Sequence, residues 1–269
     1  MRLLLVGLLL ALIVTTASAG EFVQVAGGSE AAPVKLPAYV ARPPGPGPHS
    51  AVVLVHGCGG FHSSMISWAD RLARFGHVAL AVDSFGPRGI DDDCNGAGIP
   101  WQVGDAYAGL RHLSGLAFVR ADRVALMGFS QGGWSVLEAL EKGGIERQWP
   151  QKFRAGVALY PVCQFASGLM TAPVLVLIGS ADSWTPAADC EAMAAGRTVL
   201  GSPRPAGDRS AIELIVYPGA HHGFDLVDLS LAPGRGVLAF GHRVEFNEDA
   251  MRDSMVRVRE FLKKRIAVD

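Results

Sequence analysis

The chain has 269 residues, of which 49% are hydrophobic and 18% are charged, and its formal net charge is -1 at pH 7. These proportions are typical of a globular protein with a sizeable core. The longest basic run is the short Lys263 to Arg265, so composition and charge argue against a nucleic-acid partner.

The first 19 residues have the pattern of a secretory signal peptide. Arg2 precedes an almost wholly apolar run from Leu3 to Val14, and Ala17-Ser18-Ala19 has the small residues expected before a cleavage site. An uncleaved membrane anchor is the alternative, but the apolar run is shorter than the roughly 20 residues that span a bilayer. We expect cleavage after Ala19, export to the periplasm or the medium, and no stable membrane anchor in the mature chain.

Residues 20–269 are expected to form one domain in which strands alternate with helices. Weak alternation over residues 22–41 predicts a strand pair, and six short apolar runs predict buried strands. These runs are 51–55, 77–82, 123–127, 156–160, 174–178 and 212–217. Helical spacing of apolar residues predicts helices from about residue 63, over 103–118 and 131–142, and near the C-terminus, with Ser63 or Ser64 as the first N-cap. A mostly parallel sheet with helices on both faces follows, which is an α/β fold.

The strongest chemical signal follows the predicted strand 123–127. Active sites of open parallel sheets form beyond the carboxyl ends of the strands. Here the strand is followed by Gly128-Phe129-Ser130-Gln131-Gly132, a G-x-S-x-G pattern between a strand and a helix. In that context the pattern indicates a sharp turn that exposes a serine nucleophile, and its glycines leave room for the turn. An ordinary turn with Ser130 as a helix N-cap is the alternative.

A serine nucleophile needs a base, and the base needs an orienting carboxylate. His221 and His222 follow the last predicted strand and compete for the role of base. Asp182, just beyond strand 174–178, is the favoured acid. Asp189, expected inside the next helix, and Asp225, close to the histidines in sequence, are the alternatives. Chain order serine, acid, histidine is the one expected for such a site on this kind of sheet.

Ester hydrolysis passes through an oxyanion that needs preorganised donors. We expect one donor to be the backbone N–H of Gln131, the residue after the nucleophile. The second should come from the glycine-rich loop His56-Gly57-Cys58-Gly59-Gly60, with Cys58 as the preferred donor and Gly59 as the alternative. We interpret His56 as a structural residue that hydrogen-bonds the backbone.

All four cysteines follow the expected signal peptide, and an oxidising compartment would permit two disulfides in any of three pairings. We predict Cys58–Cys94 and Cys163–Cys190, because each pair lies on loops that should meet at one rim of the sheet. Free buried thiols are the alternative. No C-x-x-C spacing is present, so we expect no zinc site, and the predicted chemistry implies no metal and no cofactor.

Residues 83–104 look like a long loop, a kind of segment that often carries function in compact domains. Within it, Arg88 has two interpretations. The favoured one is a structural ion pair with Asp91, Asp92 or Asp93, and the other is a contact with a carboxylate on the substrate. Trp184, two residues after Asp182, is a further candidate for substrate binding.

The chain resembles the dienelactone hydrolase family of α/β-hydrolases. The resemblance rests on Gly128–Gly133, on the loop of Asp182, and on Tyr217-Pro218-Gly219-Ala220-His221-His222-Gly223-Phe224. The family pattern is Y-P-G-A, one residue and then the catalytic histidine, which selects His222 as the base. It implies an α/β-hydrolase fold and a hydrolytic triad. Dienelactone hydrolases proper carry cysteine where this chain has Ser130, and they are typically cytoplasmic, so a dienelactone substrate does not follow.

The predicted function is therefore that of a serine hydrolase that cleaves a small-molecule carboxylic ester through an acyl-enzyme. A peptidase or an acyltransferase of the same fold is an alternative. A hydrolase-like binding protein without catalysis is another, although a complete triad argues against it.

Overall fold

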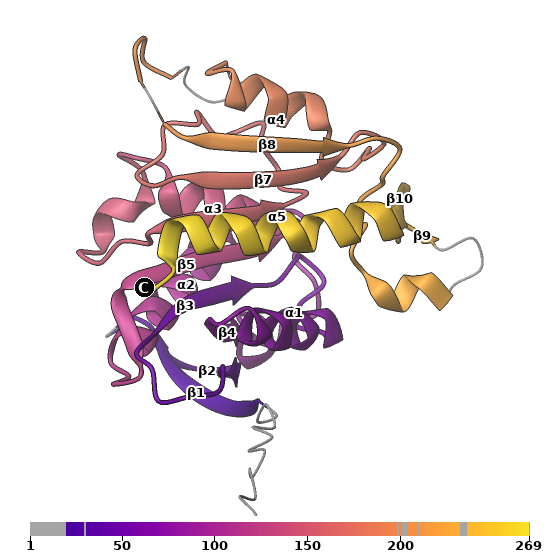
Figure 1. Cartoon of the computed structure of the whole chain (residues 1–269). Helices are drawn as coiled ribbons and strands as arrows, with labels where there is room; N and C mark the ends of the chain where they lie inside the picture. The colour runs from indigo at the N-terminus through magenta and orange to yellow at the C-terminus, as the bar shows by residue number, and fades with distance from the viewer. Residues whose placement is uncertain are drawn as a thin grey trace, which may run out of the picture.

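The structure is a computed structural model that describes residues 20–29, 31–197, 199–200, 204–208, 210–231 and 236–268. The expected signal peptide, residues 1–19, lies outside the described residues. An eight-stranded sheet with the order β1-β2-β4-β3-β5-β6-β7-β8 runs through the centre (Figure 1). The strands are β1 (Glu21–Gly28), β2 (Pro33–Ala41), β3 (His49–Val55), β4 (Val78–Val82), β5 (Val119–Phe129), β6 (Ala155–Leu159), β7 (Val174–Gly179) and β8 (Ile212–Tyr217).

The sheet is antiparallel at one edge and parallel elsewhere. Strand β2 pairs antiparallel with both β1 and β4, whereas β4, β3, β5, β6, β7 and β8 are parallel to one another. The inner strands β4, β6 and β7 are buried at every position, as expected for strands covered on both faces. The predicted α/β architecture is thereby confirmed.

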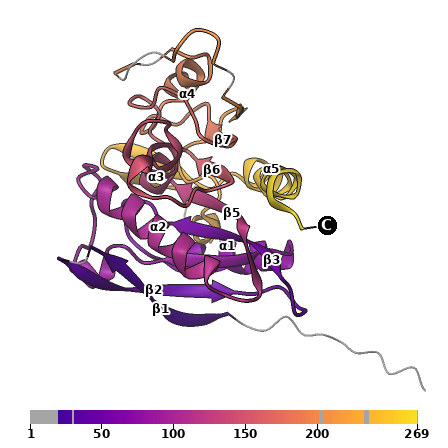
Figure 2. The same ribbon diagram turned by 90° about the vertical axis from the view of Figure 1, so that its left-hand side faces the viewer.

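Two helices cover one face of the sheet and two cover the other. Helices α1 (Ser63–Arg74) and α5 (Glu248–Ile266) lie on the face turned to the viewer in Figure 1, and α2 (Ile99–Ser114) and α3 (Gln131–Leu140) lie on the opposite face, as Figure 2 shows. Helix α4 (Ala187–Ala194) packs against β7 and β8. Among the described residues, no helix is both long and apolar enough to cross a bilayer.

Three details of the sequence prediction were wrong. Helix α2 begins at Ile99, with Pro100 in its first turn, so the expected loop 83–104 is shorter and also contains the 3-10 helix η1 (Gly86–Arg88). The N-cap of α1 is His62 and not Ser63 or Ser64, and its side chain makes no capping hydrogen bond. The third is a missed hairpin, β9 (Gly236–Ala239) and β10 (His242–Glu245), whose strands are too short to give a clear alternating pattern.

Candidate active site

Ser130 occupies a sharp turn between β5 and α3. Its backbone has φ 53° and ψ -117°, a conformation that non-glycine residues rarely adopt. The turn brings backbone segments so close that a Cβ atom on Gly128 would lie 2.1 Å from Gly132 O, and one on Gly132 would lie 2.4 Å from Val55 O. The two glycines of the G-x-S-x-G pattern are thus required by close backbone contacts. Ser130 does sit at the N-cap position of α3, but its side chain makes no capping hydrogen bond.

Three side chains from three loops form a continuous hydrogen-bonded chain. His222 Nε2 lies 2.9 Å from Ser130 Oγ, and His222 Nδ1 lies 2.7 Å from Asp182 Oδ2. Ser130 follows β5, Asp182 follows β7, and His222 follows β8. Because these strands are parallel, all three residues lie at the carboxyl ends of the strands, on one side of the molecule. Asp182 and His222 are 5% and 4% exposed, which shields the hydrogen bond between them from water.

The carboxylate of Asp182 is held by its own loop. Asp182 Oδ1 accepts backbone N–H bonds from Trp184 and Thr185, both at 2.9 Å, and Oδ2 accepts a hydrogen bond from Thr185 Oγ1 at 2.9 Å. Burial by itself would raise the pKa of Asp182. The hydrogen bonds and charge of His222 and the bonds from Thr185 outweigh burial and lower that pKa below its ordinary value. Asp182 is therefore an ionised acceptor for His222 at neutral pH.

The alternative acids and the alternative base lie elsewhere. His221 Nε2 faces Glu245 Oε2 at 3.7 Å, so the two adjacent histidines point apart. Asp225 accepts hydrogen bonds from Trp68 Nε1 and from the Tyr160 hydroxyl at 2.6 and 2.7 Å, and burial raises its pKa. Asp189 lies in α4, and no hydrogen bond in the described part of the chain links its side chain to His222.

The expected oxyanion loop, residues 56–60, passes close to Ser130. A Cβ atom on Gly57 would lie 3.4 Å from Ser130 Cβ. In the described part of the chain, no hydrogen bond uses the backbone N–H of Cys58 or of Gln131. For Gln131 this is expected, because the first amides of a helix have no carbonyl one turn earlier to bind. Both amides are therefore free to bind a ligand oxygen beside Ser130.

Buried polar groups fix the start of the oxyanion loop. Ser84 N–H donates to His56 Nε2 at 3.1 Å, and His56 Nδ1 lies 2.7 Å from Gly57 O, which assigns the ring proton to Nδ1. The Gln102 side chain donates through Nε2 to His56 O at 2.8 Å and accepts a hydrogen bond from Ser135 Oγ through Oε1. Burial lowers the pKa of His56 to about 4, so the ring is neutral at pH 7. The structural interpretation of His56 fits these contacts.

The structure pairs the same cysteines that the sequence analysis paired. Cys58 is bonded to Cys94, and Cys163 is bonded to Cys190. The first disulfide lies beside Ser130, because Cys58 and Cys94 both line the cavities that open at the serine. The second is buried, with Cys163 and Cys190 at 2% and 0% exposure.

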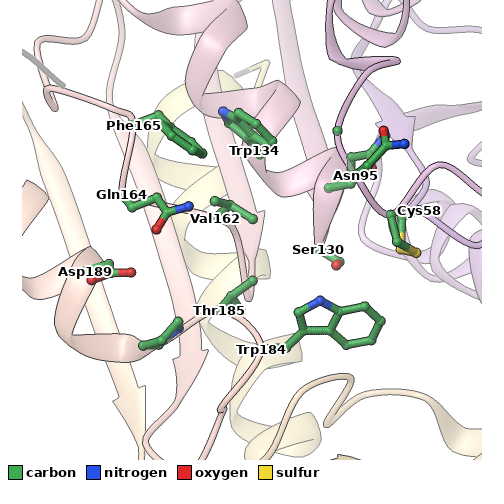
Figure 3. Close-up of a pocket in the computed structure, with 14 residues that line it drawn as sticks. Cys58, Asn95, Ser130, Trp134, Val162, Gln164, Phe165, Trp184, Thr185 and Asp189 are labelled. Atoms are coloured by element: carbon green, nitrogen blue, oxygen red, sulfur yellow. A yellow bond between two sulfur atoms is a disulfide. The ribbon is translucent and has the colours of Figure 1, made fainter. Parts of the chain in front are cut away.

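Two cavities meet at Ser130. The one in Figure 3, here called the aromatic cavity, has a volume of about 290 Å³. In that view Ser130 lies between Cys58 and Trp184, Asp189 and Gln164 lie at the far end, and Trp134 and Phe165 line the side between. The other, here called the hairpin cavity, has a volume of about 270 Å³ and is lined in part by Leu226, Phe240 and Val244. Among the described lining residues of both cavities there is no lysine or arginine.

The two predicted substrate-binding residues have different places. Trp184 lines both cavities, and its ring lies 5.0 Å from that of His222. Arg88 lines neither cavity. Its guanidinium forms a two-point ion pair with Asp105, at 2.7 and 3.0 Å, and donates to Ser84 O at 2.5 Å. The prediction that Arg88 pairs with Asp91, Asp92 or Asp93 was wrong, because Asp105 in the second turn of α2 is its partner.

Sequence reasoning missed two residues that contact Asp182 and His222. Thr185 Oγ1 lies 2.9 Å from Asp182 Oδ2 and 3.1 Å from Tyr160 O, and its single hydroxyl proton can be donated to either. The spacing Asp-x-x-Thr is a recognisable local turn motif and could have pointed to Thr185. Tyr160 adopts φ 39° and places its ring 4.7 Å from that of His222, a contact for which the sequence gives no signal. Within the described residues, no group of three or more His, Cys, Asp or Glu side chains could hold a metal ion.

Known proteins resemble this chain in sequence and in fold. A curated protein from Bradyrhizobium sp., named "Probable 2-oxo-3-(5-oxofuran-2-ylidene)propanoate lactonase", is 29% identical over 209 residues, which cover 70% of this chain and 78% of that protein. The dienelactone hydrolase-like promiscuous phosphotriesterase P91 from metagenomic libraries has a TM-score of 0.70 at 19% identity, covering 93% of this chain and all of P91. Esterase 2 of Thermogutta terrifontis, solved after phosphorylation by paraoxon, has a TM-score of 0.63 at 17% identity, covering 93% and 95% of the two chains.

The family assignment rests on most of the chain. The model of the dienelactone hydrolase family matches residues 36–266, from strand β2 to the end of helix α5. This range includes Ser130, Asp182 and His222 together with the oxyanion loop. The chain therefore belongs to the dienelactone hydrolase family and has the α/β-hydrolase fold.

Proposed function

We propose that this protein is a serine hydrolase that cleaves carboxylic esters of small molecules through an acyl-enzyme. Family membership makes it a hydrolase acting on ester bonds. The observation that carries the finer proposal is the unbroken chain from Ser130 Oγ through His222 to Asp182, with links of 2.9 and 2.7 Å. Such a chain is what an otherwise weak serine nucleophile needs.

In the proposed reaction, Ser130 Oγ attacks the ester carbonyl carbon while His222 Nε2 takes the hydroxyl proton. The N–H groups of Gln131 and Cys58 bind the oxyanion of the tetrahedral intermediate. His222 then gives its proton to the departing alkoxide, leaving an acyl group on Ser130. A water molecule, deprotonated by His222, repeats the sequence and releases the acid.

Asp182 acts on the orientation of His222 and not on the substrate. Its Oδ2 accepts a hydrogen bond from Nδ1–H, which keeps the ring proton on Nδ1 and leaves Nε2 unprotonated and facing Ser130 Oγ. As the imidazolium forms, the ionised Asp182 stabilises its charge. Thr185 keeps the carboxylate in place through its backbone and side chain.

The charge of the cavities favours neutral substrates. A carboxylate on the substrate would have no described lysine or arginine to bind in either cavity, while Asp189 and Asp92 line them. The name of the Bradyrhizobium relative describes a propanoate lactone, an anion, so the proposed preference of this chain differs from the substrate named for that relative. We therefore propose that this chain prefers neutral esters or lactones to carboxylate-bearing ones.

Labelling of the nucleophile tests the reaction class. A fluorophosphonate probe should label wild-type protein at Ser130, and Ser130→Ala should abolish both labelling and hydrolysis of p-nitrophenyl esters while circular dichroism stays unchanged. A binding protein without catalysis would give neither labelling nor turnover. Assays with matched amides, and with an added alcohol as acceptor, separate a peptidase and an acyltransferase from an esterase.

The adjacent histidines provide a matched pair of variants. His222→Ala should lower kcat by at least about 10⁴-fold, because the base is lost. His221→Ala removes the same side chain one residue earlier, and we expect activity to stay within about threefold of wild type. If His221→Ala abolished turnover and His222→Ala did not, the assignment of the base would be wrong.

Asp182→Asn should cost about 10⁴-fold in kcat with little change in fold. An asparagine amide can donate to Nδ1, which leaves the ring proton of His222 on Nε2. A protonated Nε2 faces Ser130 and cannot act as the base. Asp189→Asn makes the same chemical change in α4 and should cost less than about tenfold. Steady-state kinetics of the two variants on one neutral ester check this, and equal losses would contradict the role of Asp182.

We also propose that the protein is exported and that residues 1–19 are removed. The disulfides Cys58–Cys94 and Cys163–Cys190 support this, since such bonds persist in oxidising compartments. N-terminal sequencing of protein expressed from the full chain in a bacterial host should begin at Gly20. Retention of Met1 on protein recovered from the cytoplasm would contradict export.

A further inference from the structure

Two consecutive residues contact both halves of the proposed oxyanion hole. Cys94 is bonded through its sulfur to Cys58, and the Asp93 N–H donates to Cys58 O at 3.0 Å. On the other side, Asp93 Oδ2 accepts a hydrogen bond from Gln131 Nε2 at 3.1 Å. We call Asp93 and Cys94 the clamp. It connects two donors that lie far apart in sequence, one in the oxyanion loop and one at the start of α3.

The clamp is itself fixed. Asp93 is 8% exposed, and the same Oδ2 atom accepts the Gly98 N–H at 2.5 Å, just before α2 begins. Asp93 therefore holds the Gln131 side chain against the end of a helix that packs on the sheet. No charged side chain pairs with Asp93 in the described part of the chain, so its carboxylate serves only these amide donors.

The oxyanion loop lacks regular structure of its own. Residues 57–60 form a single turn closed by the Gly60 N–H bond to Gly57 O at 3.2 Å, and three of its residues are glycines. Oxyanion donors act only when they lie within about 2.7–3.1 Å of the developing charge. A flexible turn can keep the Cys58 N–H within such narrow limits only if something else holds it.

We propose that Asp93 and Cys94 are positioning residues of the oxyanion hole, and that full kcat requires the Cys58–Cys94 disulfide to be oxidised. This inference rests on the proposed ester hydrolysis. It assigns to one disulfide a part in transition-state stabilisation, whereas the Cys163–Cys190 bond is buried and its cysteines are not among the described residues that line the two cavities.

Cys94 is partly exposed and lines both cavities with Cys58, whereas Cys163 and Cys190 are buried, so a reductant should reach the clamp disulfide first in the folded protein. A thiolate of dithiothreitol attacks one sulfur of Cys58–Cys94 and forms a mixed disulfide. The second dithiothreitol thiol then displaces the protein thiolate, giving oxidised cyclic dithiothreitol and two cysteine thiols. Two electrons and two protons pass from the reagent to the protein, and reoxidation reverses the exchange.

The test compares two variants that each lack one disulfide. Cys58→Ser/Cys94→Ser should lower kcat for a neutral ester by about 10- to 100-fold with KM within about threefold, because misplacing one oxyanion donor weakens binding of the transition state but not of the substrate. Cys163→Ser/Cys190→Ser should lower Tm and keep kcat within about twofold. Equal kcat values in the two variants would overturn the proposal.

A tetrahedral inhibitor separates positioning from a general loss of structure. Affinity for a trifluoromethyl ketone, whose adduct with Ser130 carries an oxyanion, should fall by the same factor as kcat. Mild dithiothreitol treatment should reproduce both losses in wild-type protein and in Cys163→Ser/Cys190→Ser, with unchanged circular dichroism, and reoxidation should restore them. Reduced protein with full kcat would overturn the proposal even if the cysteine variants fail to fold.

Asp93 is tested through its acceptor oxygen. Asp93→Asn retains an oxygen that can accept from both Gly98 and Gln131, so kcat should stay within about threefold. Asp93→Ala removes the acceptor and should lower kcat by about tenfold, again with KM little changed. Wild-type protein that hydrolyses no ester would refute the proposed function, whereas active wild type with an unaffected Asp93→Ala variant would refute only the clamp.

Discussion

Two segments of the chain meet at Ser130 and are built in different ways. The segment of residues 128–133, here called the nucleophile turn, joins the end of β5 to the start of α3. It is fixed by close backbone contacts, including those with the carbonyls of Val55 and His56. The oxyanion loop, residues 56–60, is fixed by individual bonds to groups outside it, most of which involve a side chain. The disulfide to Cys94, the Ser84 N–H on His56 and the Gln102 amide on His56 O all come from residues 84–102.

The two segments should therefore respond differently to substitution. A turn fixed by backbone contacts tolerates no added Cβ atom but depends on no particular side chain around it. A loop fixed by side chains tolerates added atoms where it faces open space, but it depends on bonds that substitution, reduction or protonation can remove. The following changes test the contrast, from the largest expected effect to the smallest.

An alanine at a glycine should be severe in the nucleophile turn and mild in the oxyanion loop. Gly132→Ala would bring a Cβ atom to 2.4 Å from Val55 O and 2.5 Å from His56 O, so strand β3 or the turn must move. We expect a loss of more than about 3 kcal/mol in the free energy of unfolding and no measurable turnover. A Cβ atom on Gly59 would meet nothing within 4 Å, so Gly59→Ala should change stability by less than about 0.5 kcal/mol. Urea unfolding of both variants measures the contrast, and similar losses would contradict it.

Arg88 tests the outer support of the oxyanion loop. Its guanidinium binds Asp105 and also Ser84 O, next to the amide that bonds His56. Arg88→Gln leaves the Asp105 carboxylate, 1% exposed, without its partner, and we expect a loss of about 3 kcal/mol in stability. The ratio of kcat/KM for anionic and neutral esters should not change, because Arg88 lines neither cavity.

The exposed pair of Arg120 and Asp122 supplies the control for Arg88. Their side chains are 41% and 63% exposed, so Arg120→Gln should leave the urea midpoint of unfolding unchanged. A selective loss of activity on anionic esters in Arg88→Gln would revive the idea that Arg88 binds substrate.

The same contrast explains what the sequence could and could not predict. Ser130 and the parallel strands could be predicted because a local steric pattern, glycine around serine between an apolar run and a helix, allows few structures. The partner of Arg88 could not, because Asp105 is 17 residues away and nearer acids compete for it. The bond between Asp93 and Gln131 spans 38 residues and joins two side chains of ordinary type. The short β9–β10 hairpin lies at the surface, where alternation of apolar and polar residues carries little information.

The smallest effect concerns protonation of the oxyanion loop. His56 is wholly buried and accepts the Ser84 N–H through Nε2, and burial lowers its pKa from 6.5 to about 4. Between these two values the unfolded chain binds a proton that the folded protein does not, so the free energy of unfolding falls as the pH is lowered. At 1.36 kcal/mol per pH unit, His56 should remove about 2 kcal/mol between pH 7 and pH 5, with no contribution above about pH 7.

A second buried histidine permits a matched measurement of this effect. His77 is hydrogen-bonded to Ser50, and burial lowers its pKa to about 4 as well, but it contacts no residue of the oxyanion loop. His56→Gln and His77→Gln should therefore each remove about 2 kcal/mol from the difference in urea stability between pH 7 and pH 5. The clamp disulfide should become easier to reduce at pH 7 only in His56→Gln, because only that change loosens the start of the oxyanion loop. Equal rates of reduction in the two variants would show that the disulfide holds the loop without help from His56.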